Sequence, residues 1–162
     1  MMIMCIFVRI LLTSLALVSG GVFASDSAIT FSPTPTTRAT LRVNDHSVTF
    51  DISALKTGEH HGEIDIDTEN QIHVVVDNYS FDKRKGFSIW SIDEGMGVYT
   101  IHRIFLYSDI RATFVEAHPA CGDQFINLKV DKKRRRLTST YYEGNVPKLC
   151  ITRLPKIDDI TR

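Results

Sequence analysis

The chain has 162 residues, and its 19 Lys and Arg side chains balance 19 Asp and Glu side chains, so the formal net charge at pH 7 is zero. A near-neutral protein lacks the overall electrostatic field that would collect nucleic acid or an anionic membrane. We therefore expect no nucleic-acid partner. The length suits one domain with one hydrophobic core rather than two.

The first 24 residues have the pattern of a secretory signal peptide. Arg9 precedes an apolar run at residues 10–18, which is too short to span a bilayer comfortably. Ala24 closes a stretch of small and aliphatic residues at which a signal peptidase would cleave. Cleavage there would release the mature chain into the periplasm without a membrane span. The alternative is an uncleaved membrane anchor.

The next segment, residues 25–38, is rich in Ser, Thr and Pro and has few large apolar side chains. Pro33 and Pro35 favour an extended, unpaired backbone. We expect a flexible leader here, followed by a single β domain over residues 39–162.

Two cysteines remain once the signal is removed, because Cys5 lies within it. An even number of cysteines in an oxidising compartment favours a disulfide, here between Cys121 and Cys150. Two reduced thiols are the alternative. A zinc site is disfavoured, because two thiols alone do not complete its tetrahedral shell.

From residue 39 onward, short segments of alternating apolar and polar residues are separated by turn residues. Residues 40–43 and 47–52 predict a hairpin, and residues 57–62 predict a polar loop. No window has the 3.6-residue apolar periodicity of a helix. We therefore predict an all-β fold, a small antiparallel sheet assembly that is distorted and propeller-like, with a sandwich as second choice. Further strands are expected at 64–66, 71–76, 87–92, 98–107, 111–116, 125–130, 137–142 and 149–154.

One loop has the outline of a calcium site, with Asn78, Ser80 and Asp82 at alternate positions after a strand. Lys83 stands where such a loop usually has Gly, and neighbouring cations would weaken the binding of a divalent ion. An ordinary polar turn is the favoured interpretation, so no metal and no cofactor are expected. The adjacent His60 and His61 would point to opposite faces of a strand, which disfavours joint ligation of a metal.

Candidate catalytic groups are few, and we do not expect an enzyme. The chain has no Gly-x-Ser-x-Gly elbow. Asp93 and Glu94 are adjacent carboxylates beside the glycines of residues 95–97, and paired carboxylates can hydrolyse glycans. Adjacent side chains on an extended backbone diverge, however, which argues against joint catalysis.

Two projecting segments could instead contact a partner. The basic run 132–136, which includes Lys133 and Arg135, is either a contact patch for an acidic partner or a solvated hairpin tip. Tyr141 and Tyr142 precede a Gly-Asn turn, where they could present a rigid ring to a partner or cap the edge of the core.

Several segments occur in a familiar order: 78–82, 87–90, 93–99 and 103–107, followed by the surroundings of Cys121 and of Cys150. This order resembles a family of exported bacterial proteins with a small, distorted β-propeller-like fold, related to periplasmic lysozyme inhibitors. Members resemble immunity proteins that protect a cell from peptidoglycan-cleaving effectors of its rivals. The resemblance covers about two thirds of the mature chain. It implies a calcium-holding loop near residue 80 and independently supports the disulfide.

The leading hypothesis is a periplasmic protein that inhibits a lysozyme-like peptidoglycan hydrolase by inserting a loop into its active cleft, with basic neighbours complementing the catalytic carboxylates. A non-inhibitory envelope module, such as a protein or ion sensor or an assembly accessory, is the alternative. An enzyme acting on glycan through Asp93 or Glu94 is a third class. The candidate contact residues are Gly95, Met96, Gly97, Val98 and Tyr99, then Tyr141 and Tyr142, and then Lys133 and Arg135.

Overall fold

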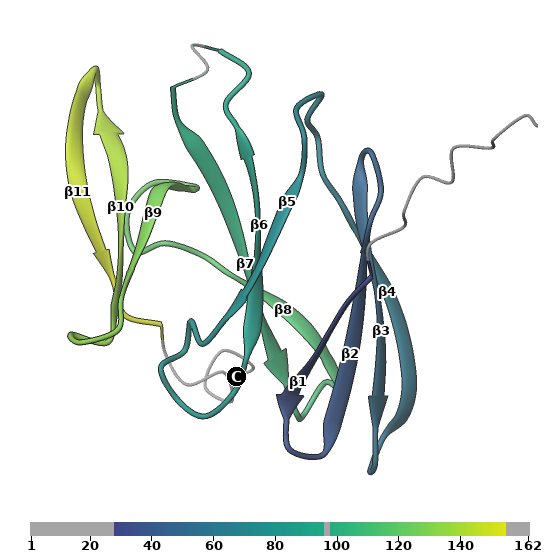
Figure 1. Cartoon of the computed structure of the whole chain (residues 1–162). Helices are drawn as coiled ribbons and strands as arrows, with labels where there is room; N and C mark the ends of the chain where they lie inside the picture. Colours follow the sequence, from purple (N-terminus) through teal and green to yellow (C-terminus); the bar gives the residue numbers. More distant parts are fainter. Residues whose placement is uncertain (1–27, 96–97, 155–162) are drawn as a thin grey trace, which may run out of the picture.

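The computed structural model describes residues 28–95 and 98–154. Within these ranges the regular secondary structure consists of β-strands, and there is no helix. The first four strands form an antiparallel meander in the order β1-β2-β3-β4 (Figure 1). The predicted all-β fold is confirmed. The strands of this sheet are β1 (Ile29–Thr34), β2 (Thr37–Val43), β3 (Ser47–Ala54) and β4 (Gly58–Asp65).

The second sheet has seven strands, in the order β11-β10-β9-β7-β6-β5, with β8 paired to β7. One edge of β7 is shared, because β9 pairs with its beginning and β8 with its end. The chain therefore forms three successive meanders, β1–β4, β5–β8 and β9–β11, which lie side by side in Figure 1. The strands are β5 (His73–Asp77), β6 (Gly86–Ile92), β7 (Thr100–Ser108), β8 (Thr113–Ala117), β9 (Phe125–Asp131), β10 (Arg136–Glu143) and β11 (Val146–Thr152).

Strand β7 separates two hydrophobic cores. Phe105 and Tyr107 face the core shared with the first sheet, whereas Ile104 and Leu106 face the core closed by β9 and β10. Successive side chains of a strand point to opposite faces, and both faces of β7 are covered by a core. All four side chains are therefore buried. The arrangement is sandwich-like, and the propeller-like shape is not confirmed.

An aromatic cluster joins the two sheets, with Phe114 of β8 at its centre. The Phe114 ring centroid lies 5.3 Å from Phe50 and 6.0 Å from Phe31, both of the first sheet. It lies 4.8 Å from Phe87 and 5.8 Å from Tyr107, both of the second. Most of these pairs are edge-to-face, a geometry that adds about 0.5–1.5 kcal/mol per pair beyond burial of area.

The prediction of a flexible leader at 25–38 is wrong for its described part, which forms β1 and the start of β2. Phe31 anchors β1 in the aromatic cluster, and Pro33 is buried. Proline is tolerated because β1 is an edge strand, and the Pro33 carbonyl accepts a hydrogen bond from the Lys85 amide at 3.0 Å. The proposed signal at 1–24 lies outside the described residues.

The predicted polar loop at 57–62 is also corrected, because β4 begins at Gly58 and pairs with β3 along its whole length. Its polar side chains lie on an exposed face of the sheet. Gly62 permits this pairing, since the Phe50 ring occupies the space above it.

The predicted disulfide is confirmed: Cys121 and Cys150 are bonded, with their Cα atoms 5.8 Å apart. The bond ties the segment before β9 to β11. Cys150 is completely buried.

Gly62 has no room for a side chain, because an added Cβ would lie 2.1 Å from Cζ of Phe50. Gly62→Ala should lower the free energy of unfolding by about 1–3 kcal/mol, because the Phe50 ring must move. In a Phe50→Leu background the same change should cost little, since the clash is absent. Urea denaturation of the single and double variants tests this, and equal losses in both backgrounds would contradict it.

Removing the disulfide should also destabilise the fold. The two cysteines are 29 residues apart, and the replacement Cys121→Ala/Cys150→Ala should cost about 3–4 kcal/mol by the chain-entropy model. Denaturant unfolding of this variant should match that of the reduced wild-type protein. An unchanged urea midpoint would contradict the prediction.

Candidate functional site

Four of the predicted contact residues, Gly95, Val98, Tyr99 and Tyr142, lie at one end of the molecule, where the β6–β7 loop and the β10–β11 turn project (Figure 1). The rings of Tyr99 and Tyr142 pack edge-to-face with centroids 5.8 Å apart. A side-chain hydrogen bond with Tyr99 raises the pKa of Tyr142. Gly95 lies exposed in the same loop. Met96 and Gly97 lie outside the described residues.

Backbone and carboxylate hydrogen bonds hold the base of the β6–β7 loop. The Asp93 amide donates to the Tyr99 carbonyl at 2.9 Å, which closes the loop on itself. Glu94 Oε1 accepts the Glu69 amide at 2.6 Å, which ties the loop to the β4–β5 connection. This bond and a second one from the Thr68 side chain lower the pKa of Glu94.

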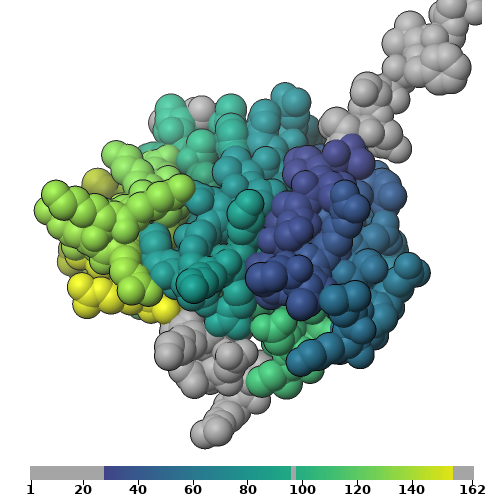
Figure 2. Space-filling model, turned by 60° about the horizontal axis from the view of Figure 1, so that its bottom comes forward, coloured from purple at the N-terminus to yellow at the C-terminus, as the bar shows by residue number. Residues whose placement is uncertain are grey.

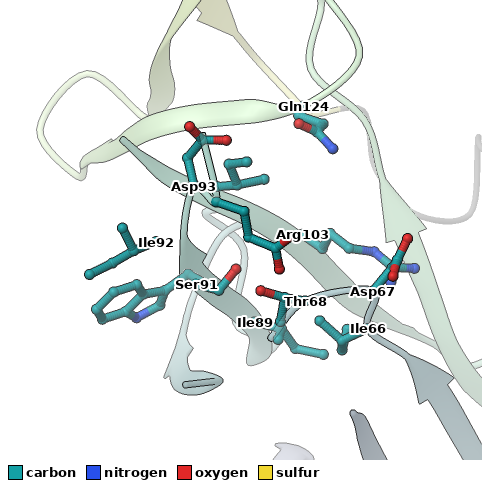
Figure 3. Close-up of a pocket in the computed structure, with 12 residues that line it drawn as sticks. Ile66, Asp67, Thr68, Ile89, Ser91, Ile92, Asp93, Arg103 and Gln124 are labelled. Atoms are coloured by element: carbon teal, nitrogen blue, oxygen red, sulfur yellow. The ribbon is translucent and has the colours of Figure 1, made fainter. Parts of the chain in front are cut away.

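A pocket lies beside this loop, between the β4–β5 connection and strands β6 and β7 (Figure 3). Isoleucines form part of its wall, including Ile66 and Ile89. Three carboxylates line it, those of Asp67, Asp93 and Glu94. The pocket therefore combines an apolar wall with negative charge.

Arg103 is the basic side chain among the lining residues, but its charge is already neutralised. Its guanidinium donates to both carboxylate oxygens of Glu116, at 2.8 and 2.7 Å, and to the Asp65 carbonyl at 2.7 Å. Such bidentate pairs are strong and directional. Hydrogen bonding to Arg103 lowers the pKa of Glu116, and the same pairing raises the pKa of Arg103. Arg103 thus joins β7 to β8 and to the first sheet.

The surroundings of Glu94 do not favour the general-acid role that glycan hydrolysis would require. A glycosidase needs one carboxyl with a raised pKa to protonate the leaving group. The pKa of Glu94 is lowered instead, because backbone and hydroxyl donors stabilise its charged form. Glu94 therefore acts as a fixed negative charge and as a tie between two loops.

The other predicted contact residues lie elsewhere. Tyr141 lies on the opposite face of β10 from Tyr142, next to Gly122 and the disulfide. The basic run forms the β9–β10 turn at the far end of the molecule (Figure 1). Lys133 and Arg135, which were second-choice contact residues, therefore do not share a surface with the β6–β7 loop, because one strand length separates the two turns.

In the calcium-like loop, an arginine stands close to the carboxylate that would hold an ion. Asp82 Oδ1 accepts hydrogen bonds from Ser80 Oγ and the Arg84 amide, both at 2.7 Å, and its Oδ2 accepts the Arg84 guanidinium. The Asn78 side chain donates to the Asp82 carbonyl. Within residues 28–95 and 98–154, no group of three or more His, Cys, Asp or Glu side chains is arranged to hold a metal.

An aromatic stack that the sequence pattern did not predict lies across β5, β6 and β7. His73, Trp90 and His102 are direct cross-strand partners, with ring centroids 4.1 and 5.9 Å apart. Nδ1 of His102 is buried without a hydrogen-bond partner. Burial lowers the pKa of His102 to about 4, so the ring is neutral at pH 7. Strand periodicity alone could not show this stack, because it depends on the register between strands.

Acidification should therefore weaken the fold through His102. Its pKa is about 4 in the folded chain and 6.5 in the unfolded chain, so the unfolded state binds more protons between these values. Stability should be complete above pH 6.5 and should fall by on the order of 1–2 kcal/mol toward pH 4, after allowing for solvent screening. Urea unfolding at several pH values should show that His102→Leu removes this dependence. The exposed-site control His118→Gln should keep it, and identical slopes in all three proteins would contradict the prediction.

No protein-family model, no curated protein and no solved structure matches this chain. The resemblance to lysozyme inhibitors therefore depends on the order of the sequence motifs alone. Among the described residues, no helix is long and apolar enough to cross a membrane.

Proposed function

We propose that this protein binds and inhibits a peptidoglycan glycan hydrolase of the lysozyme type, with the β6–β7 loop entering the active cleft. One observation carries the proposal, the packing of Tyr99 against Tyr142. It makes the β6–β7 loop and the β10–β11 turn one projecting surface. Tyrosines at such a surface supply contact area at a small cost in side-chain entropy.

The loop base supports this role because it is ordered before any partner arrives. The Asp93–Tyr99 and Glu94–Glu69 hydrogen bonds fix its position on the sheets. Binding then costs less conformational entropy than it would for an unanchored loop. Exposed Val98, beside Tyr99, adds apolar area that a cleft could cover.

The electrostatics favour a partner with basic residues around its cleft. Asp67, Asp93 and Glu94 make the surroundings of the loop acidic, and Arg103 is neutralised by Glu116. Complementary charge would speed association and fix the orientation of the complex. Inhibition would then be steric, since the loop would exclude the glycan from the cleft.

The proposed setting is the periplasm. A disulfide of this kind persists in an oxidising compartment. There the protein would act as an immunity protein, protecting its own cell from a delivered cell-wall hydrolase.

The test mixes the exported protein with lysozyme-type hydrolases and follows the loss of turbidity of a cell-wall suspension. The wild-type protein should slow clearing by at least one of them. Tyr99→Ala/Tyr142→Ala should weaken inhibition by about 30-fold or more, since buried interface tyrosines commonly contribute 2 kcal/mol or more. The matched control is Leu55→Ala/Ile110→Ala, which removes exposed apolar side chains at the other end and should inhibit like the wild type.

Undiminished clearing by every hydrolase tried would reject the proposal. Capture of a hydrolase without any effect on clearing would also reject it and would favour a non-inhibitory binding module. Equal losses in the tyrosine variant and its control would show that the β6–β7 end is not the contact surface.

A further inference from the structure

A second surface lies at the opposite end of the molecule and has the opposite charge. Five connections meet there, the β1–β2, β3–β4, β7–β8 and β9–β10 turns and the β5–β6 segment 78–85, and we call this surface the basic end (Figure 1). Figure 2, in which this end is turned forward, shows the teal 78–85 segment between the purple β1–β2 region and the lime-green β9–β10 region.

A hydrogen bond and ion pairs connect the basic end into one surface. The β9–β10 turn is attached to the 78–85 segment, because Arg135 donates to the Phe81 carbonyl at 2.7 Å. A further ion pair joins Lys132 to Asp77 at 2.9 Å. From the same segment, Arg84 reaches Asp109 of the β7–β8 turn at 3.9 Å. Two charge runs that lie far apart in the sequence, 83–85 and 132–136, therefore form one patch.

Ion pairs with cations already involve the four aspartates that lie in these connections or directly beside them. Asp77 pairs with Lys132, and Asp82 and Asp109 pair with Arg84. Asp131 pairs with Arg134 and Arg136. Other exposed cations of the basic end have no acidic partner among the described residues. The described part of this surface therefore has a net positive charge. These cations are Lys56, Lys83, Lys85, Arg111, Lys133 and Arg135.

Two turns of the basic end also carry an exposed aliphatic side chain beside a cation. Leu55 of the β3–β4 turn is 85% exposed and precedes Lys56. Ile110 of the β7–β8 turn is 68% exposed and precedes Arg111. These two turns are neighbours, since Lys56 and Ile110 line one hollow. Aliphatic tips beside cations would enter the region below lipid headgroups, whereas a soluble polyanion would not cover them.

We propose that the basic end docks on the surface of an anionic lipid bilayer, as a peripheral contact without a membrane span. Each Lys or Arg near an anionic surface strengthens such binding several-fold, and the aliphatic tips add burial of apolar area. The acidic β6–β7 end, with Asp67, Asp93 and Glu94, would point away from the bilayer. Net neutrality therefore does not exclude a membrane surface here, because the charges are segregated along the strands. This inference does not depend on the proposed inhibition.

Flotation with lipid vesicles tests the proposal on the protein recovered from the cell envelope. Phosphatidylcholine vesicles that contain phosphatidylglycerol should bind the protein at low salt, and high salt should release it. Lys83→Gln/Lys133→Gln removes two charges whose side chains make no hydrogen bond or ion pair within the described structure, and it should weaken partitioning by about 30-fold. The control Arg42→Gln/Lys148→Gln changes the net charge equally, at two exposed ion pairs away from the basic end, and should bind like the wild type.

The aliphatic tips need a separate pair of variants. Leu55→Ser/Ile110→Ser should weaken vesicle binding by about tenfold or more. The control Val98→Ser/Leu149→Ser alters similarly exposed side chains elsewhere and should have no effect. The proposal is overturned by equal binding to neutral phosphatidylcholine vesicles or by equal losses in a variant and its control. Binding to inorganic polyphosphate but not to vesicles would also overturn it.

Discussion

The structure depends on the burial of β7 on both of its faces. The odd-numbered side chains of β7, such as Phe105, pack in the core shared with the first sheet. The even-numbered side chains, such as Ile104, pack in the core closed by β9 and β10. A strand in this position must be apolar on both faces near its end, and residues 104–107 meet that requirement. The same strand carries Arg103, whose guanidinium joins the two sheets beside the pocket by donating to the Asp65 carbonyl of β4. The cores and the candidate site therefore share one scaffold.

Because the chain consists of antiparallel meanders, each connection within a meander lies at one of two ends. At one end, the Tyr99–Tyr142 contact and the carboxylates of the pocket form an acidic, aromatic surface. At the other end, the 78–85 segment and the β9–β10 turn form a basic one. The zero net charge of the whole chain does not reveal this separation of charge. The separation gives the molecule two surfaces of different chemistry, and each suits a different kind of partner.

Several polar groups that suggest chemistry in the sequence serve the fold in the structure. Glu94 joins two loops through the Glu69 amide, and Asp82 is neutralised by Arg84. Lys132 and Arg135 attach one hairpin to a neighbouring segment. In each case the partner comes from elsewhere in the fold, and for Asp82 and Lys132 it also neutralises a charge that would otherwise attract a ligand. The groups that remain exposed are those best placed to recognise a partner.

The sequence by itself determined the all-β class, most strand positions and the disulfide, because alternation and cysteine parity are local or countable properties. It misassigned residues 29–34, since the burial of Phe31 depends on rings from distant strands. Only the tertiary structure decided which predicted contact residues share a surface. Tyr99 and Tyr142 meet there, whereas Lys133 lies a strand length away. Which residues meet depends on strand order and register, and these follow from packing across the whole chain.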